Sequence, residues 1–330
     1  MQKLINPLLS SYEREEAKAI LRMILEDVHK TPWTRFVAYG EQAVGNVDDL
    51  RREIARLASG EPVQHVIGHT AFCGRRFRVT PDTLIPRPET AELVRWIADA
   101  EQHRPSPRIL DIGTGTGCIA ISLAHLLPHS LVTALDVSEK ALAVARANDS
   151  DEMAIKGNDD EPTHDVMPSK RCCMQASDGK TNHDKASIDG SNNVEANGSA
   201  MPNANKVTFL LHDILSPTAP PVPPQDIIVS NPPYIRRSES ATMHRNVLDH
   251  EPHLALFVPD DDPLLFYRAI ARHAQTLLAP HGVLYFELNA LHATQTADLV
   301  SSLGFTNVEL RSDQFSRPRF LRCEKAQKKE

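Results

Sequence analysis

One amide side chain of this sequence stands beside two prolines, directly after the apolar run 227–230. Asn231 is followed by Pro232, Pro233 and Tyr234. Two successive prolines fix the backbone φ angles and remove two amide donors. The carbonyls of Asn231 and Pro232 and the Asn231 side-chain oxygen can therefore accept hydrogen bonds from an –NH2 group, and Tyr234 can cover a planar group from one side. A proline-rich loop that only caps a strand is the alternative.

A glycine-rich turn, Asp111 to Gly117 (DIGTGTG), follows an earlier apolar run. Glycine at every second position lets the backbone turn tightly against a ligand. The spacing differs from G-x-G-x-x-G, since Cys118 follows the third glycine, and the leading carboxylate would repel a pyrophosphate. A cationic nucleoside ligand such as S-adenosylmethionine fits better. The expected cofactor contacts in this turn are Asp111, Gly113, Thr114, Gly115, Thr116 and Gly117.

Two further carboxylates close apolar runs. Asp136 stands about 20 residues beyond the glycine turn, where an acidic residue accepts hydrogen bonds from ribose hydroxyls. A helix-capping role before Ser138 is the alternative. Asp213 ends the run from Phe209 and could approach the adenine amino group, although a structural role is equally compatible. Asn231 completes the predicted cofactor contacts.

The chemistry that these residues suit is methyl transfer to a nitrogen whose lone pair is delocalised, as in an amide or an aniline. Such a nitrogen is a poor nucleophile, so the enzyme must align nitrogen, methyl carbon and sulfur. Fixed acceptors must also polarise the N–H bonds. We assign the catalytic roles to Asn231, Pro232 and Tyr234, and the mechanism requires no metal, nucleophilic Ser or Cys, or catalytic His.

Strands and helices alternate around these motifs. This alternation predicts a doubly wound, mostly parallel α/β sheet. The expected strands are 108–111, 131–136, 227–230 and 283–288, and the expected helices are 119–127 and 140–148.

The chain divides into three predicted parts. Residues 1–64 form a small helical N-terminal domain, which serves either packing or oligomerisation, or the docking of a macromolecular substrate. Residues 65–88 form a hairpin linker. Residues 89–330 form the catalytic domain, interrupted at 149–206 by a polar stretch that we interpret as a disordered insertion.

Charge and hydropathy narrow the class of protein. The net charge is −7, and the insertion carries 11 acidic and 6 basic residues, so the rest is nearly neutral. The basic residues outside the insertion form only pairs, so we expect no direct nucleic-acid contact. No run of 18 apolar residues and no secretory signal occur, and the five cysteines lack metal-ligand spacing, so we expect a cytoplasmic protein without membrane or metal partners.

The sequence resembles the release-factor glutamine methyltransferase family (PrmC/HemK). The resemblance is carried by segments 68–79 (GHTAFCGRRFRV), 83–90 (TLIPRPET), 111–117 (DIGTGTG), 136–148 (DVSEKALAVARAN) and 226–235 (DIIVSNPPYI). It implies a Rossmann-like class I S-adenosylmethionine-dependent methyltransferase domain and methylation of glutamine N5 in the Gly-Gly-Gln motif of class 1 peptide chain release factors. It also implies a helical N-terminal domain that docks the factor.

Carried over to this sequence, the resemblance gives the glutamine-binding role to Asn231, Pro232, Pro233 and Tyr234. Arg87 and Glu89 lie in the TLIPRPET signature, where they shape the entrance of the site or support the hairpin. Ile214 stands where some members have an aromatic residue beside adenine, and Asn289 stands where glycine is common. We expect the enzyme to be a monomer.

Two other functions stay open at this point. The Asn-Pro-Pro-Tyr motif is shared with nucleic-acid methyltransferases that modify adenine N6 or guanine N2, which would need a basic groove and a flipped base. A non-catalytic scaffold that kept the fold is the third hypothesis, and the presence of Asp111, Asp136 and Asn231 argues against it.

Overall fold

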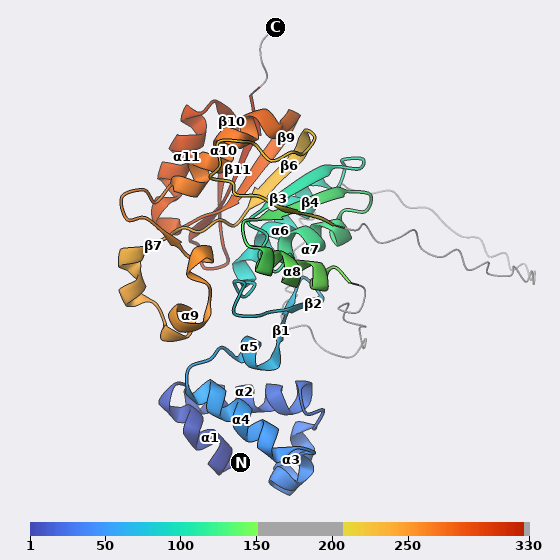
Figure 1. Cartoon of the computed structure of the whole chain (residues 1–330), viewed down its shortest axis with the longest axis vertical. Helices are drawn as coiled ribbons and strands as arrows, with labels where there is room; N and C mark the ends of the chain where they lie inside the picture. The colour runs from blue at the N-terminus through green and yellow to red at the C-terminus, as the bar shows by residue number, and fades with distance from the viewer. Residues whose placement is uncertain (151–206, 327–330) are drawn as a thin grey trace, which may run out of the picture. The chain divides into compact units, whose positions relative to one another are not determined.

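A seven-stranded sheet forms the centre of the computed structural model, which describes residues 1–150 and 207–326 (Figure 1). Its strand order is β10-β11-β9-β6-β3-β4-β5, and the pairs from β9 to β5 are parallel, whereas β11 runs antiparallel to β9 and β10. The bounds are β3 Arg108–Ile112, β4 Leu131–Asp136, β5 Thr208–Leu211, β6 Gln225–Ser230, β9 Leu278–Glu287, β10 Phe305–Ser312 and β11 Pro318–Lys325. The predicted mostly parallel sheet is confirmed, and β9 begins earlier than expected. The insertion predicted at 149–206 lies, beyond its first two residues, outside the described part of the chain.

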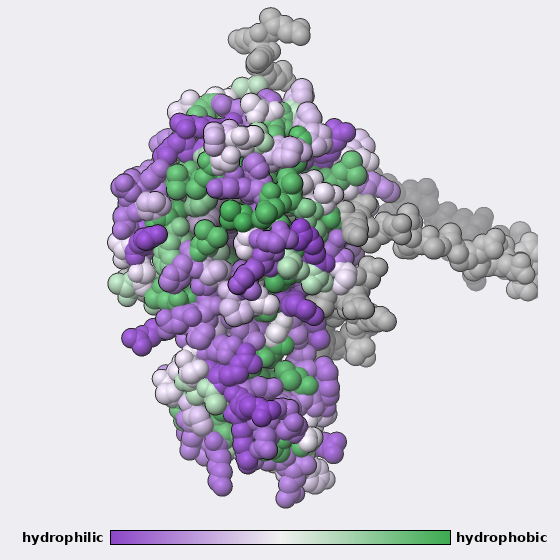
Figure 2. Space-filling view, viewed as in Figure 1, coloured by the Kyte–Doolittle hydropathy of each residue, from purple (hydrophilic) through white to green (hydrophobic). Residues whose placement is uncertain are grey.

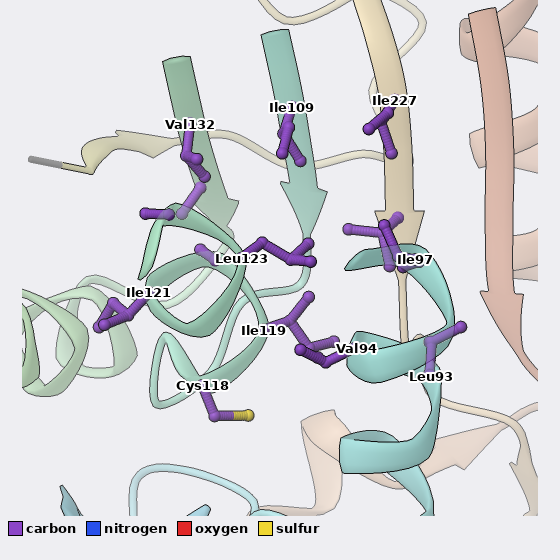
Figure 3. Close-up of a cluster of buried hydrophobic side chains, with 14 of the residues drawn as sticks. Leu93, Val94, Ile97, Ile109, Cys118, Ile119, Ile121, Leu123, Val132 and Ile227 are labelled. Carbon is purple, nitrogen blue, oxygen red and sulfur yellow. The ribbon is translucent and has the colours of Figure 1, made fainter. Parts of the chain in front are cut away.

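Helices cover both faces of this sheet, which explains why its strands are apolar on both sides. Side chains alternate along a strand, so Ile109 packs into one core while Leu110 packs into the other. Figure 3 shows the first core, where strand residues Ile109, Val132 and Ile227 face helical side chains. The helices are α6 Pro88–Glu101, α7 Cys118–Leu126 and α8 Glu139–Asn148, with α10 Leu265–Leu277 and α11 Ala293–Ser302 packed in the second core.

The N-terminal helices have a hydrophobic core of their own, which contains Leu21, Leu25, Phe36 and Leu50. At the start of α4, the Asn46 side chain accepts a hydrogen bond from the Asp49 amide and so caps the helix. The predicted helical character of this region is confirmed. The bounds are α1 Gln2–Ile5, α2 Arg14–Asp27, α3 Trp33–Tyr39, α4 Val47–Ala58 and α5 Val63–Ile67.

The expected hairpin is present but shorter than predicted. Strands β1 His69–Phe72 and β2 Arg75–Arg78 pair antiparallel around Cys73-Gly74. Both turn residues have positive φ, 46° and 75°, as a two-residue turn that matches the twist of a hairpin requires. The prediction that the hairpin starts at residue 65 was wrong, because residues 63–67 form α5, whose C-cap is Gly68 in the left-handed conformation.

Five short elements lie between β6 and α10: β7 Ile235–Arg236, the 3-10 helix η4 Arg237–Thr242, α9 Arg245–His250, the 3-10 helix η5 His253–Ala255 and β8 Phe257–Val258. Within the described residues, no helix is both long and apolar enough to cross a membrane.

The buried side chain of Asn148, at the end of α8, joins the hairpin to the glycine turn. Its Oδ1 accepts a hydrogen bond from the Arg78 amide at 2.7 Å, and its Nδ2 donates to the carbonyls of Arg78 at 3.1 Å and Thr116 at 2.9 Å. One amide thus satisfies three backbone groups of two loops that are distant in sequence.

Removal of this amide should destabilise the protein. Asn148→Ala leaves buried backbone groups without partners, so we expect the free energy of unfolding to fall by about 1–3 kcal/mol. Urea unfolding measures the change. Gln102→Ala, which removes an exposed side-chain hydrogen bond to the Asp99 carbonyl, is the matched control and should change the stability little. Equal losses in both variants would contradict the role of Asn148.

Candidate active site

A cavity of about 310 Å³ opens where the carboxyl ends of β3, β4, β5 and β6 meet. This edge is where ligands bind in open parallel sheets. Its lining comes from the glycine turn after β3 and from the loops that follow the other three strands. Further lining residues come from the loop before α6, the start of α6, the segment before β8, and α10. They are Asp82, Thr83, Leu84, Pro86, Arg87, Thr90, Pro252, Leu254, Ala255, Phe266 and Ile270.

The glycine turn lies against the end of β4. The amides of Gly113 and Thr114 both donate to the Leu135 carbonyl, at 2.9 and 3.0 Å, and the Gly115 amide donates to Asp136 Oδ2 at 2.9 Å. Gly113, Gly115 and Gly117 all have positive φ. The cavity lining includes Gly113 to Thr116, as expected for these cofactor contacts, whereas Gly117 lies behind the turn.

Gly117 packs against the helices. A Cβ there would lie 2.8 Å from Ile121 Cδ1 and 3.1 Å from Ala145 Cβ. Apart from Gly113 itself and its two chain neighbours, no heavy atom of the described residues lies within 4 Å of the corresponding position at Gly113. The two glycines therefore have different reasons to lack a side chain, close packing at Gly117 and open cavity space at Gly113.

Asp111 is buried beneath the turn and does not line the cavity, and its predicted contact with the cofactor stays a prediction. Its Oδ2 accepts hydrogen bonds from Thr114 Oγ1 at 2.6 Å and from the Ala120 amide at 3.2 Å. Burial raises the pKa of this carboxyl to about 7. Asp111 therefore holds the turn and caps the first turn of α7, and the Thr114 hydroxyl is used for that contact.

Asp136 and Asp213 both line the cavity, and their contacts with the ribose and with adenine stay predictions. Asp136 accepts a hydrogen bond from the Ser138 amide at 2.9 Å. The helix-capping alternative was wrong, because the N-cap of α8 is Ser138, whose own side chain accepts from the Ala141 amide. Burial raises its pKa. Asp213 Oδ1 accepts from the Leu215 amide at 2.9 Å. A carboxylate oxygen has more than one lone pair, so these contacts leave acceptor capacity for ligand hydroxyl and amino groups.

The chemistry of the cavity lining suits S-adenosylmethionine. Acceptors at Asp136 and Asp213 suit ribose hydroxyls and the adenine amino group, while the glycine turn leaves room for close approach. The walls between them are apolar and can cover the adenine ring. They are formed by Ile119, Leu135, Val137, Ile214 and Ile270.

The segment after β6 reaches the cavity from the other side. Asn231, Pro232 and Pro233 line it. Ser230 Oγ donates to the Ile112 carbonyl at 2.6 Å and so fixes the start of this segment to β3. Asn231 Nδ2 donates to Thr90 Oγ1 at 3.2 Å.

Tyr234 lies outside the cavity lining, and the role of its ring in covering the substrate stays a prediction. The ring packs against the second core, and its hydroxyl donates to Glu287 Oε1 at 3.4 Å. Burial raises the pKa of Tyr234. Its carbonyl accepts a hydrogen bond from Asn289 Nδ2 at 3.1 Å, so Asn289 supports the loop after β6.

Arg87 and Glu89 lie in different surroundings. Arg87 lines the cavity, and its Nη2 lies 2.5 Å from Oε1 of the buried Glu251, whose Oε2 accepts from the Ile85 amide at 3.1 Å. This ion pair anchors the loop before α6. Glu89 lies in the first turn of α6 outside the cavity lining, so of these two residues only Arg87 reaches the cavity.

Sequence reasoning missed Thr90, Glu251 and Glu287. Glu287 closes the buried strand β9, and its position as a carboxylate after an apolar run is the signal that identified Asp111 and Asp136. Thr90 and Glu251 carried no such signal, because their roles depend on partners that lie far away in the chain. No group of three or more His, Cys, Asp or Glu residues in the described ranges could hold a metal ion.

The fold and this cavity define the class of protein as an S-adenosylmethionine-dependent methyltransferase. Residues 109–159 match the family described as Methyltransferase domain, and residues 3–68 match the PrmC N-terminal domain.

The chain belongs to the release factor glutamine methyltransferase family. It is 36% identical to the Release factor glutamine methyltransferase of Flavobacterium psychrophilum, over 96% of this chain and 95% of the relative. It is 39% identical to that of Bacteroides thetaiotaomicron, over 83% of this chain and 79% of the relative. The solved protein-(glutamine-N5) methyltransferase of Alicyclobacillus acidocaldarius is 22% identical over 76% of this chain and 99% of that chain, with a TM-score of 0.37.

The two glycines give a matched test of the turn. Alanine at either position adopts a left-handed φ, which costs roughly 1–2 kcal/mol. Gly117→Ala should lose about 1–3 kcal/mol more, because its Cβ overpacks the contact with Ile121 and Ala145. Gly113→Ala should stay folded but bind S-adenosylmethionine more weakly. Urea unfolding and calorimetric titration measure the two effects, and equal stability of the variants would contradict the packing role of Gly117.

Proposed function

We propose that this protein methylates the side-chain amide nitrogen (N5) of the glutamine in the Gly-Gly-Gln motif of class 1 peptide chain release factors. The observation that carries the proposal is the convergence of Asn231, Pro232 and Pro233 on the cavity formed by the glycine turn and Asp136. Family membership supports the choice of substrate, since relatives of nearly the same length carry that name.

The residues on the substrate side bind and orient an –NH2 group. Asn231 Oδ1 and the Pro232 carbonyl accept its hydrogen bonds and hold the amide nitrogen in line with the transferred methyl carbon. When bound, S-adenosylmethionine supplies that methyl group on a positively charged sulfur. The same fixed acceptors stabilise the positive charge that develops on nitrogen as the new bond forms. The product nitrogen is then strongly acidic and releases its proton.

We further propose that residues 1–64 dock the release factor. Within this region, α3 exposes the apolar side chains of Val37 and Tyr39, with exposed fractions of 55% and 66%. Figure 2 shows a largely hydrophilic surface over these N-terminal helices, so the contact with the factor combines polar groups with a few apolar ones. A monomer in the cytoplasm fits this role.

One arginine of each basic pair lies beside a carboxylate, which favours a protein substrate over a nucleic acid. Arg51 pairs with Glu41 at 2.6 Å, Arg76 with Asp27 at 3.3 Å, and Arg236 with Glu239 at 2.9 Å. Each of these cations is therefore neutralised locally. A groove that binds nucleic acid would instead direct its cations toward phosphates.

The mass of a release factor after incubation with this protein and S-adenosylmethionine tests the proposal. We expect a gain of one methyl group, which peptide mapping places on the Gly-Gly-Gln glutamine. Asn231→Ala should lower the rate on the order of 10²–10³-fold, because it removes a fixed acceptor at the reacting nitrogen.

Calorimetric titration of the Asn231→Ala protein with S-adenosylmethionine is the control for an intact cofactor site. An unmodified factor, together with methyl transfer into DNA or RNA in a parallel reaction, would replace this function with the nucleic-acid alternative.

A further inference from the structure

Three side chains from distant parts of the chain form a hydrogen-bonded series beside the substrate end of the cavity. Asn231 Nδ2 donates to Thr90 Oγ1 at 3.2 Å, and Thr90 Oγ1 donates to Glu287 Oε2 at 2.7 Å. Thr90 and Glu287 are both buried. Thr90 also lines the cavity, whereas Glu287 does not. The series therefore runs from the cavity wall to a buried carboxylate at the end of β9.

The capacity of each group to donate or accept determines which group donates in the next hydrogen bond of the series. An ionised carboxylate can only accept hydrogen bonds, so the Thr90 hydroxyl must donate its one proton to Glu287. The Thr90 oxygen can then only accept, and the Asn231 side chain must present its –NH2 group to it. The Asn231 oxygen is left to face the cavity as an acceptor.

We propose that Thr90 and Glu287 are positioning residues that fix the orientation of the Asn231 carboxamide and thereby select a substrate nitrogen that carries hydrogens. This inference rests on the proposed function. With the carboxamide reversed, the site would present a donor to the substrate, and the –NH2 group of glutamine would lose one of its acceptors. A primary amide is the chemical class that the fixed orientation favours.

The surroundings of Glu287 keep its carboxylate in place. Tyr234 donates to the other oxygen, and Tyr267 donates to the Glu287 carbonyl at 3.2 Å. Arg319 of β11 and Glu89 of α6 are the further charged groups that act on it. Burial raises the pKa of Glu287 to about 7, and the Thr90 hydrogen bond and Arg319 oppose that rise.

Removal of the Thr90 hydroxyl is the direct test. Thr90→Val keeps the shape of the side chain, and it should lower kcat for release-factor methylation by roughly ten- to a hundredfold, the cost of a misplaced polar group. The affinity for S-adenosylmethionine, measured by calorimetry, should stay within a few-fold. Thr90→Ser restores the hydroxyl and should recover most of the rate.

A control variant, Thr276→Val, and the comparison of Thr90→Val with Thr90→Ser separate a positioning role of Thr90 from other causes of a lower rate. Thr276→Val removes a hydroxyl that donates to a helix carbonyl on the exposed surface and should leave kcat unchanged. Equal rates for Thr90→Val and Thr90→Ser, whether both normal or both low, would overturn the positioning role. A wild-type protein that leaves release factors unmethylated would instead overturn the proposed function. If Thr90→Val does not fold, the pH profile of kcat in Glu287→Gln, compared with that of the wild-type protein, tests the positioning role instead.

The series also predicts a pH dependence. Above its pKa Glu287 is ionised and the carboxamide orientation is fixed; below it, the protonated carboxyl can donate to Thr90, whose hydroxyl can then donate to a reversed Asn231. The kcat of the wild-type protein at saturating S-adenosylmethionine should therefore fall as the pH drops through about 7. Glu287→Gln cannot titrate and should lose this dependence. An identical pH profile of kcat in both proteins would contradict the role of Glu287.

Discussion

The parallel arrangement of β4, β3 and β6 is the constraint on which the rest of the site depends. Neighbouring parallel strands end at the same edge, so the loops after them meet regardless of their distance in sequence. The register pairs Asp111 with Ala134 and with Val229, which places the glycine turn between Asp136 and Asn231. The antiparallel β11 then covers β9, so that Glu287 at the end of β9 is buried instead of exposed at a sheet edge.

Buried carboxylates hold this edge together at a cost in desolvation. Asp111, Glu251 and Glu287 are almost fully buried, and each accepts hydrogen bonds from groups that it must position: the glycine turn, the loop before α6 and Thr90. A buried acidic group without such partners would be strongly unfavourable. Because an apolar residue could fill the same volume without that cost, the polar contacts are better explained by the orientation they impose than by stability.

The sequence predicted the parts of the site that are continuous in the chain. The glycine turn, Asp136 and the Asn231-Pro232-Pro233 segment are identified by spacing and by backbone chemistry that local residues determine. The contacts of Thr90 could not be predicted in the same way, because its partners Asn231 and Glu287 lie 141 and 197 positions away. Local patterns also cannot tell on which side of a turn a side chain lies, which explains why Asp111 and Tyr234 were placed on the cavity wall. The antiparallel β10 and β11 lacked a motif that would have identified their partners.

The contacts that join the N-terminal helices to the hairpin and the glycine turn also link residues that are distant in sequence, so local patterns could not predict them. Asp27, at the end of α2, lies 2.9 Å from His69 Nε2 and 3.3 Å from Arg76 Nη2, so one carboxylate contacts both strands of the hairpin. The hairpin in turn bonds to Asn148, whose amide also holds the Thr116 carbonyl of the glycine turn. Hydrogen bonds and ion pairs therefore connect the region expected to dock the substrate with the turn expected to hold the cofactor. These contacts form a continuous structural path between the two regions. The path couples the two sites functionally only where binding of the release factor changes the affinity for S-adenosylmethionine, or the reverse.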